Sequence, residues 1–117
     1  MRLAWLITGI PGAGKSTVAR LLAAAMPRAA HIEGDRLGEL IVSGAVWPDA
    51  EPREESRRQM RLNVRNQCLL ARSFADAGFV PVMDYVVVDR ARLGLYRRLL
   101  PEFDLRFVVL HLRRSAS

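Results

Sequence analysis

The chain has 117 residues, with 18 Lys or Arg against 12 Asp or Glu, a formal net charge of +6 and 50% apolar residues. This composition is typical of a globular protein, and the length excludes a second full domain, so we expect one domain over residues 1–117. The one cysteine, Cys68, excludes an intramolecular disulfide, and no apolar run approaches the roughly 20 residues of a membrane-spanning helix; we therefore expect a cytoplasmic protein without a membrane partner.

The first half of the chain predicts two strands and two helices. Residues 3–8 form a continuous apolar run, which is typical of a strand buried on both faces of a parallel sheet. Residues 15–26 are rich in helix formers and stop at a proline. A short strand over 30–33 follows, then a helix over 36–43 and a loop over 44–51.

A long helix opens the second half. Pro52 is well placed as its first residue, and Gly78 is a natural stop. Apolar residues recur on one helical face at Met60, Val64, Cys68, Ala71 and Ala75. A third strand is predicted within 79–88, where Pro81 removes a ladder donor, so that either the strand starts after it or a bulge forms there. A helix over 90–100 and a strand over 105–112 complete the chain.

Strands and helices alternate along the whole sequence. Apolar strands in such an alternation favour an α/β fold of three layers, with a parallel sheet of about four strands flanked by helices.

Residues 9–17 match G-x-x-x-x-G-K-[ST], the phosphate-binding loop. The loop lies between a predicted buried strand and a predicted helix, which is the context that this motif requires. We predict that its residues hold ATP: Gly9, Pro11, Gly12, Ala13, Gly14, Lys15, Ser16 and Thr17. Lys15, the one lysine among 18 basic residues, supplies a charge for the β- and γ-phosphates, and the Ser16 hydroxyl is placed to bind Mg²⁺.

Two acids follow predicted strands, where ligands bind in open α/β sheets. Asp35 follows the second strand and Asp84 lies near the end of the third. For Asp35 the alternative is an N-cap of the next helix, and for Asp84 a structural hydrogen-bonding role is an equal alternative. Asp89 is interpreted as a helix cap.

Other polar and aromatic residues near these acids have two interpretations each. Trp47 and Tyr85 either wall an acceptor pocket or anchor the core and the loop. His31 and His111 lie on predicted strands and are interpreted as packed side chains. Arg36 either pairs with an anionic acceptor or phosphate or lies on the surface.

The chain resembles the small P-loop kinases, which include chloramphenicol phosphotransferase, gluconate and shikimate kinases and the kinase part of polynucleotide kinases. The resemblance rests on residues 9–17, 31–37 and 82–84. It implies a P-loop NTPase fold in which Asp35 contacts the acceptor hydroxyl and takes its proton. It also implies that Glu33 approaches Mg²⁺ through water, and that Asp84 lies near the metal and the acceptor.

Kinases of this kind continue after the fourth strand into a lid that carries arginines. This sequence ends at Arg113-Arg114-Ser115-Ala116-Ser117, where such a lid would begin, so we expect a domain that is short at its C-terminus. Arg113 and Arg114 are candidates for a partial substitute. The open edge of the fourth strand invites pairing with another chain, which makes a homodimer possible.

These observations predict a kinase that moves the γ-phosphoryl group of Mg-ATP to a hydroxyl of a small molecule. One alternative is a P-loop module that binds nucleotide without turnover. Another is a polynucleotide 5′-kinase, which needs a basic channel beside Asp35. The arginines are scattered among acids without interleaved aromatic residues, so a nucleic-acid partner is not expected.

Overall fold

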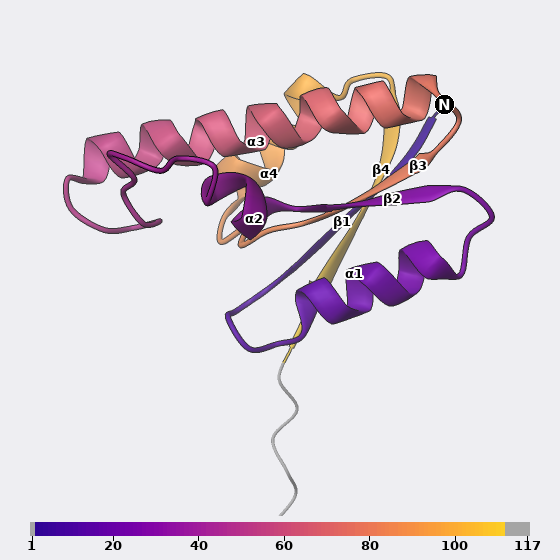
Figure 1. Ribbon diagram of the computed structural model, residues 1–117, viewed down its shortest axis with the longest axis horizontal. Coiled ribbons are helices and arrows are strands. Elements are labelled where there is room, and N and C mark those ends of the chain that lie inside the picture. Colours follow the sequence, from indigo (N-terminus) through magenta and orange to yellow (C-terminus); the bar gives the residue numbers. More distant parts are fainter. Residues whose placement is uncertain (1, 112–117) are drawn as a thin grey trace, which may run out of the picture.

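The computed structural model describes residues 2–111, and Figure 1 shows the arrangement of their strands and helices. The elements in chain order are β1 (Arg2–Gly9), α1 (Lys15–Ala24), β2 (Ala29–Glu33), α2 (Gly34–Gly38), α3 (Arg53–Asp76), β3 (Val80–Asp84), α4 (Arg90–Leu99) and β4 (Phe103–Leu110). The predicted alternation of strands and helices is confirmed.

The four strands form one parallel sheet in the order β2-β3-β1-β4. The central strand β1 carries the apolar run, since it is covered on both faces. The carboxyl ends of the strands share one edge of the sheet, where Glu33 pairs with Asp84, Ile7 pairs with Asp84, and Gly9 pairs with Leu110. The phosphate-binding loop leaves β1 at this edge.

Helices cover both faces of the sheet and give three layers (Figure 1): α1 lies on one face, and α3 and α4 lie on the other. Ile7, Val82 and Ala19 are buried between the sheet and α1. The larger core lies on the other face, where the predicted apolar side of α3 is confirmed by Val64, Cys68 and Ala71, which are buried, and by Met60 and Ala75, which pack against them.

Pro81 lies inside β3, which begins one residue earlier at Val80. The Val80 amide donates to the Arg28 carbonyl on the β2 side, at 3.0 Å. Successive amides of a strand point to opposite sides, so the missing amide of Pro81 faces β1. Pairing between β1 and β3 begins only at Val82. The proline thus lies where pairing with β1 has not yet begun, and the register with β2 runs through it without a bulge.

Several predicted boundaries are wrong, most of all for α2, which ends at Gly38 instead of residue 43. Leu40 and Val42 are exposed, so the apolar residues after Gly38 have no surface to pack on, and a short helix without tertiary contacts is not stable. Residues 39–52 form the connection to α3. The strand β3 ends at Asp84, since the Val87 amide donates to the Thr8 hydroxyl, at 2.8 Å, instead of extending the ladder.

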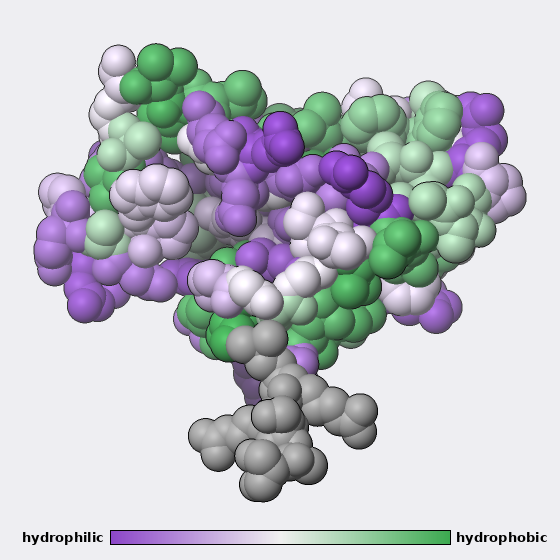
Figure 2. Space-filling view, turned by 60° about the horizontal axis from the view of Figure 1, so that its bottom comes forward, coloured by the Kyte–Doolittle hydropathy of each residue, from purple (hydrophilic) through white to green (hydrophobic). Residues whose placement is uncertain are grey.

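The last strand, β4, lies at an edge of the sheet, as expected. Figure 2 shows apolar surface in the lower part of the view, and the exposed apolar side chains include Val18 and Leu21 of α1 and Val109 of β4. Pairing of this edge with a second copy stays a prediction. Within residues 2–111, no helix is long and apolar enough to cross a membrane.

Candidate functional site

The phosphate-binding loop turns on glycines with a left-handed backbone. Gly12 has a φ of 87° and Gly14 a φ of 85°, a region that other residues enter at a cost. The Ala13 amide closes the turn by donating to the Ile10 carbonyl, at 3.0 Å. Helix α1 starts directly after Gly14, so its first amides, which have no partner within the helix, face the loop. This is the backbone arrangement that binds phosphate oxygens.

Gly9 packs the start of the loop against β4. A Cβ at this position would lie 3.1 Å from the Ala13 Cβ and 3.1 Å from the Leu110 carbonyl oxygen. Any side chain would therefore push the loop away from the strand, which explains why the motif has a glycine here.

Lys15 and Ser16 lie in the first turn of α1. Lys15 is only 8% exposed, and none of the carboxylates of residues 2–111 lies within ion-pair distance of its amine. A hollow of about 250 Å³ beside this turn is lined by Ser16, Thr17, Arg20 and Leu21. The charge of Lys15 is therefore not neutralised by an ion pair within the described fold.

Asp84 is buried, at 2% exposure, and makes a hydrogen bond to Nε2 of His31 on the neighbouring strand. Burial raises the pKa of Asp84; the hydrogen bond and the charge of His31 oppose this, Glu33 adds to it, and Lys15 lowers the pKa. The structure thus gives Asp84 the hydrogen-bonding role that the sequence left open. His31, expected only to pack, is a partner of this carboxyl. A role of Asp84 beside a metal stays a prediction.

Glu33 and Asp35 flank the start of α2. Glu33 holds the N-cap position, and its carboxylate lies 3.3 Å from Nε of Arg36 and 3.9 Å from a guanidinium nitrogen of Arg20 on α1. Asp35 lies in the first turn of α2 and is exposed, so the interpretation of Asp35 as the N-cap is wrong. Its negative charge raises the pKa of Tyr85, although burial of the ring is the larger cause.

Magnesium usually takes one or two oxygens from protein and the rest from phosphates and water. The Ser16 hydroxyl and the Glu33 carboxylate are a donor set of this kind, and Arg20 links the α1 region to Glu33. Across residues 2–111 there is no group of three or more His, Cys, Asp or Glu side chains that could hold a metal by itself. Binding of magnesium by Ser16 and Glu33 stays a prediction.

Gly34 is a site residue whose role the sequence did not reveal. A Cβ there would lie 2.8 Å from the Asp84 carbonyl oxygen and 2.8 Å from Nε2 of Gln67, and it would also collide with the Tyr85 ring. The segment that carries Asp35 is therefore pressed against β3 and α3. The signal in the sequence was the glycine between two acids, but its neighbours come from residues more than 30 positions away.

The other predicted residues have mixed outcomes. Asp89 is the N-cap of α4 and accepts from the Arg92 amide, at 2.9 Å, as predicted. Tyr85 is buried, as expected of a core residue, but Trp47 is 79% exposed and does not anchor the core. His111 is exposed and follows the end of β4, so its interpretation as a packed side chain is wrong. Arg113 and Arg114 lie outside the described residues.

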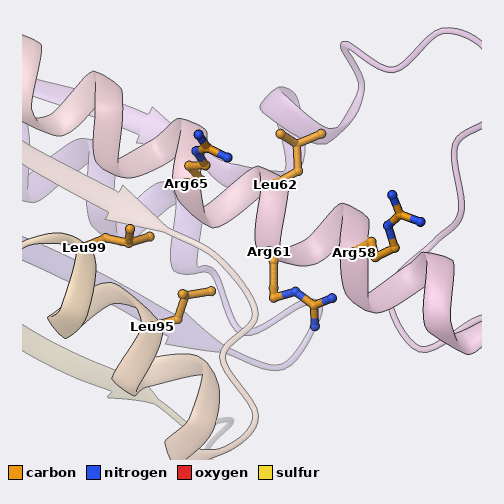
Figure 3. A pocket seen from close by; sticks show the side chains of 6 residues that line it. All are labelled: Arg58, Arg61, Leu62, Arg65, Leu95 and Leu99. Carbon is orange, nitrogen blue, oxygen red and sulfur yellow. The ribbon is translucent and has the colours of Figure 1, made fainter.

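An arginine-lined hollow lies between α3 and α4 (Figure 3). Its volume is about 370 Å³, and it is lined by Arg58, Arg61, Leu62, Arg65, Leu95 and Leu99. In Figure 3 the three guanidinium groups do not converge on one point. At about 100° per residue, the three arginines lie 140° to 160° around α3 from Asn63, which faces α2 through its bond to Gly34. The hollow is thus not a basic channel beside Asp35.

Comparison with known proteins identifies a family that this chain matches. Residues 6–115 match the model of a family described as AAA domain. The adenylyl-sulfate kinase of Vibrio parahaemolyticus is 34% identical over 99 residues, which are 81% of this chain and 44% of that protein. The chain thus spans less than half of this relative.

Solved structures show the same fold. The APS kinase CysC of Mycobacterium tuberculosis, in complex with AMPPNP and APS, has a TM-score of 0.72 at 21% identity, over 92% of this chain and 62% of that one. A gluconokinase from Sinorhizobium meliloti 1021 has a TM-score of 0.64 at 21% identity, over 97% of this chain and 61% of that one.

The family match includes the phosphate-binding loop, the whole of β2, β3 and β4, and β1 from Leu6 onward. The chain therefore belongs to the AAA domain family and has the P-loop kinase fold that its sequence motifs indicated.

Proposed function

We propose that this chain transfers the γ-phosphoryl group of Mg-ATP to a hydroxyl group of a small molecule. One observation carries the proposal: a single edge of the sheet holds the phosphate-binding loop, the uncommitted charge of Lys15 and the exposed carboxylate of Asp35. A loop that binds phosphate needs no acid opposite it. A phosphotransferase needs one to orient the acceptor.

The loop residues would hold the nucleotide. Backbone amides after Gly12 and Gly14 face the phosphates, Lys15 neutralises the charge on their β- and γ-oxygens, and Ser16 and Glu33 are the proposed metal ligands, Glu33 through water. Mg-ATP supplies the phosphoryl group and a bound cation that draws charge from its oxygens. Phosphoryl transfer has a loose transition state, so positioning and charge neutralisation account for most of the rate.

Asp35 is the proposed group that meets the acceptor. A carboxylate is a much weaker base than an alkoxide, so Asp35 would not ionise an alcohol before the reaction. It instead accepts a hydrogen bond from the hydroxyl, orients it for in-line attack, and takes the proton late in the transfer. Asp84, buried against His31, would keep the end of β3 in place and contribute negative charge near Lys15.

The acceptor itself is proposed only by class. The names of two similar proteins, an adenylyl-sulfate kinase and a gluconokinase, suggest adenylyl sulfate and gluconate as first compounds. Both are anionic and carry hydroxyl groups. Arg36, which is exposed and lies one residue after Asp35, could neutralise such an anion by leaving Glu33.

The test is release of ADP in the presence of candidate acceptors. Asp35→Asn should lower acceptor-stimulated ADP release by about 10²- to 10⁴-fold, the usual range for loss of a general base, and should change Mg-ATP affinity by less than about twofold. Glu39→Gln, which removes an exposed carboxylate at the other end of α2, is the matched control and should change neither. Equal losses of transfer and of nucleotide affinity in Asp35→Asn would remove Asp35 from the proposed role.

Two other outcomes would redirect the proposal. If the wild-type protein binds Mg-ATP and no acceptor raises ADP release, the chain is a nucleotide-binding module. If an oligonucleotide is phosphorylated, and its affinity falls steeply with salt, the acceptor is a nucleic acid, despite the position of the arginine-lined hollow.

A further inference from the structure

A chain of buried polar side chains links α4 to α2 through α3. The Tyr96 hydroxyl donates to Oε1 of Gln67 at 2.7 Å, Nε2 of Gln67 donates to Oδ1 of Asn63 at 2.8 Å, and Nδ2 of Asn63 donates to the Gly34 carbonyl at 2.8 Å. All three side chains are buried in the larger core. Burial of so many polar groups is costly unless each is paired.

The direction of these hydrogen bonds is fixed from one end to the other. A carbonyl oxygen only accepts, so Asn63 must present its Nδ2 to Gly34 and its Oδ1 to Gln67. Gln67 must then donate with Nε2, which leaves Oε1 to accept from Tyr96. A flip of Asn63 would lose two hydrogen bonds and a flip of Gln67 would lose its bond to Asn63, so the chain has one arrangement.

The chain ends on the peptide unit that carries Asp35. The Gly34 carbonyl and the Asp35 amide belong to the same planar peptide group. A hydrogen bond to this carbonyl therefore fixes the orientation of the peptide plane that precedes the Asp35 Cα. Because Gly34 has no side chain, the same segment can pack directly against the Asp84 carbonyl. Asn63 thus fixes the backbone next to Asp35, the residue proposed to orient the acceptor.

Helix α2 also depends on Asn63 for its position. It has five residues, too few for a helix that is stable by itself. Its two glycines, Gly34 and Gly38, lie one turn apart on the side that faces Asn63, and a Cβ at Gly38 would lie 3.2 Å from Nδ2 of Asn63. Gly38 therefore makes room for Asn63, and Gly34 makes room for Gln67 and the end of β3.

We propose that Asn63, Gln67 and Tyr96 are positioning residues that set the orientation of Asp35 for phosphoryl transfer, acting through the Gly34 carbonyl. This inference rests on the proposed function, because it assigns Asp35 its role there. A purely structural core at these positions would be served as well by apolar side chains. The polar chain instead specifies one arrangement of α2 against α3.

The test compares Asn63→Leu and Tyr96→Phe with Cys68→Ala. Cys68 follows Gln67 on α3, is buried in the same core and makes no hydrogen bond in the chain, so its truncation reports general loosening of the core. The first readout is hydrogen exchange of the Glu39 amide, which donates to the Asp35 carbonyl at 3.2 Å. The second is acceptor-stimulated ADP release beside Mg-ATP affinity.

We expect Asn63→Leu to speed exchange of the Glu39 amide and to lower the transfer rate by about tenfold or more, with Mg-ATP affinity changed by less than about twofold. Tyr96→Phe, which keeps the ring and loses only the hydroxyl, should give smaller effects of the same sign. Cys68→Ala should leave the transfer rate unchanged. It should change the exchange of the Glu39 amide no more than it changes the exchange of the amides of α1.

The two readouts separate failure of this inference from failure of the proposed function. If the wild-type protein transfers no phosphoryl group, the proposed function fails, and the exchange of the Glu39 amide still decides whether the polar chain holds α2. If Asn63→Leu or Tyr96→Phe changes neither readout more than Cys68→Ala does, the inference is overturned. If Asn63→Leu does not fold, the comparison of Tyr96→Phe with Cys68→Ala decides the question.

Discussion

Replacement of Gly34 by alanine should destabilise the fold far more than the same replacement at Gly38, although both glycines belong to α2. The added methyl group at position 34 would lie 2.8 Å from the Asp84 carbonyl oxygen and 2.8 Å from the buried amide of Gln67. Neither neighbour can move freely, because one is strand backbone and the other is hydrogen-bonded on both sides.

The expected magnitude follows from two opposing effects. Extra atoms forced into a packed core cost typically about 1–3 kcal/mol, and contacts with backbone and with Tyr85 favour the upper part of that range. Alanine gains up to about 1 kcal/mol over glycine in a helix interior. We therefore expect Gly34→Ala to lower the free energy of unfolding by about 2 kcal/mol, or about 1 M in urea midpoint for a slope near 2 kcal/mol per molar.

The assay is urea unfolding of the two variants beside the wild type. At Gly38 the nearest atom is Nδ2 of Asn63, at 3.2 Å, so a displacement of a few tenths of an ångström relieves the contact, whereas the contacts at Gly34 are 2.8 Å or shorter. We expect Gly38→Ala to stay within about 1 kcal/mol of the wild type, since a small clash opposes the helix gain. Equal midpoints for the two variants would refute the close packing of Gly34.

Three further predictions concern other parts of the molecule. Because burial raises the pKa of Asp84, its charged form opposes folding; Asp84→Asn should therefore raise unfolding stability at pH 7, and this advantage should shrink as the pH falls through the raised pKa of the folded protein and should be lost below the ordinary carboxyl value of about 4. A difference that does not change with pH in urea titrations would contradict this. Gly14→Ala should cost roughly 1–2 kcal/mol of stability, because φ is 85° and a side chain meets no atom within 4 Å, so strain alone acts; an unchanged midpoint would count against the loop conformation. Burial raises the pKa of Cys68 to about 12, so its reaction with a disulfide reagent at pH 8 should require urea, and fast labelling of the native protein would contradict its burial.

The fold could be predicted where local signals and tertiary packing agree. The apolar run of β1, the glycines and Lys15 of the loop, and the apolar face of α3 each indicate one structure, and each is observed. The end of α2 could not be predicted, because the helical pattern of residues 39–43 lacks a surface to pack on. Trp47 does not anchor the core for a related reason, since the connection that carries it runs over the surface.

The site could be predicted only as far as motifs reach. Residues 9–17 and the acids after β2 and β3 come to one edge because parallel strands end there together. The contact of His31 with Asp84 joins residues 53 positions apart, and that of Asn63 with Gly34 joins residues 29 apart. Such pairs depend on the order of the strands in the sheet and on which face of α3 is turned toward α2. No local sequence pattern encodes either.

Titration calorimetry with Mg-ATP tests the central claim most directly. The wild-type protein should bind, Lys15→Ala should bind at least about tenfold more weakly, which is about 1.4 kcal/mol, and Arg97→Ala should match the wild type, since this exposed arginine lies in the last turn of α4. If the wild-type protein does not bind Mg-ATP, or if Lys15→Ala binds as tightly as the wild type, the assignment of the nucleotide to this loop is contradicted.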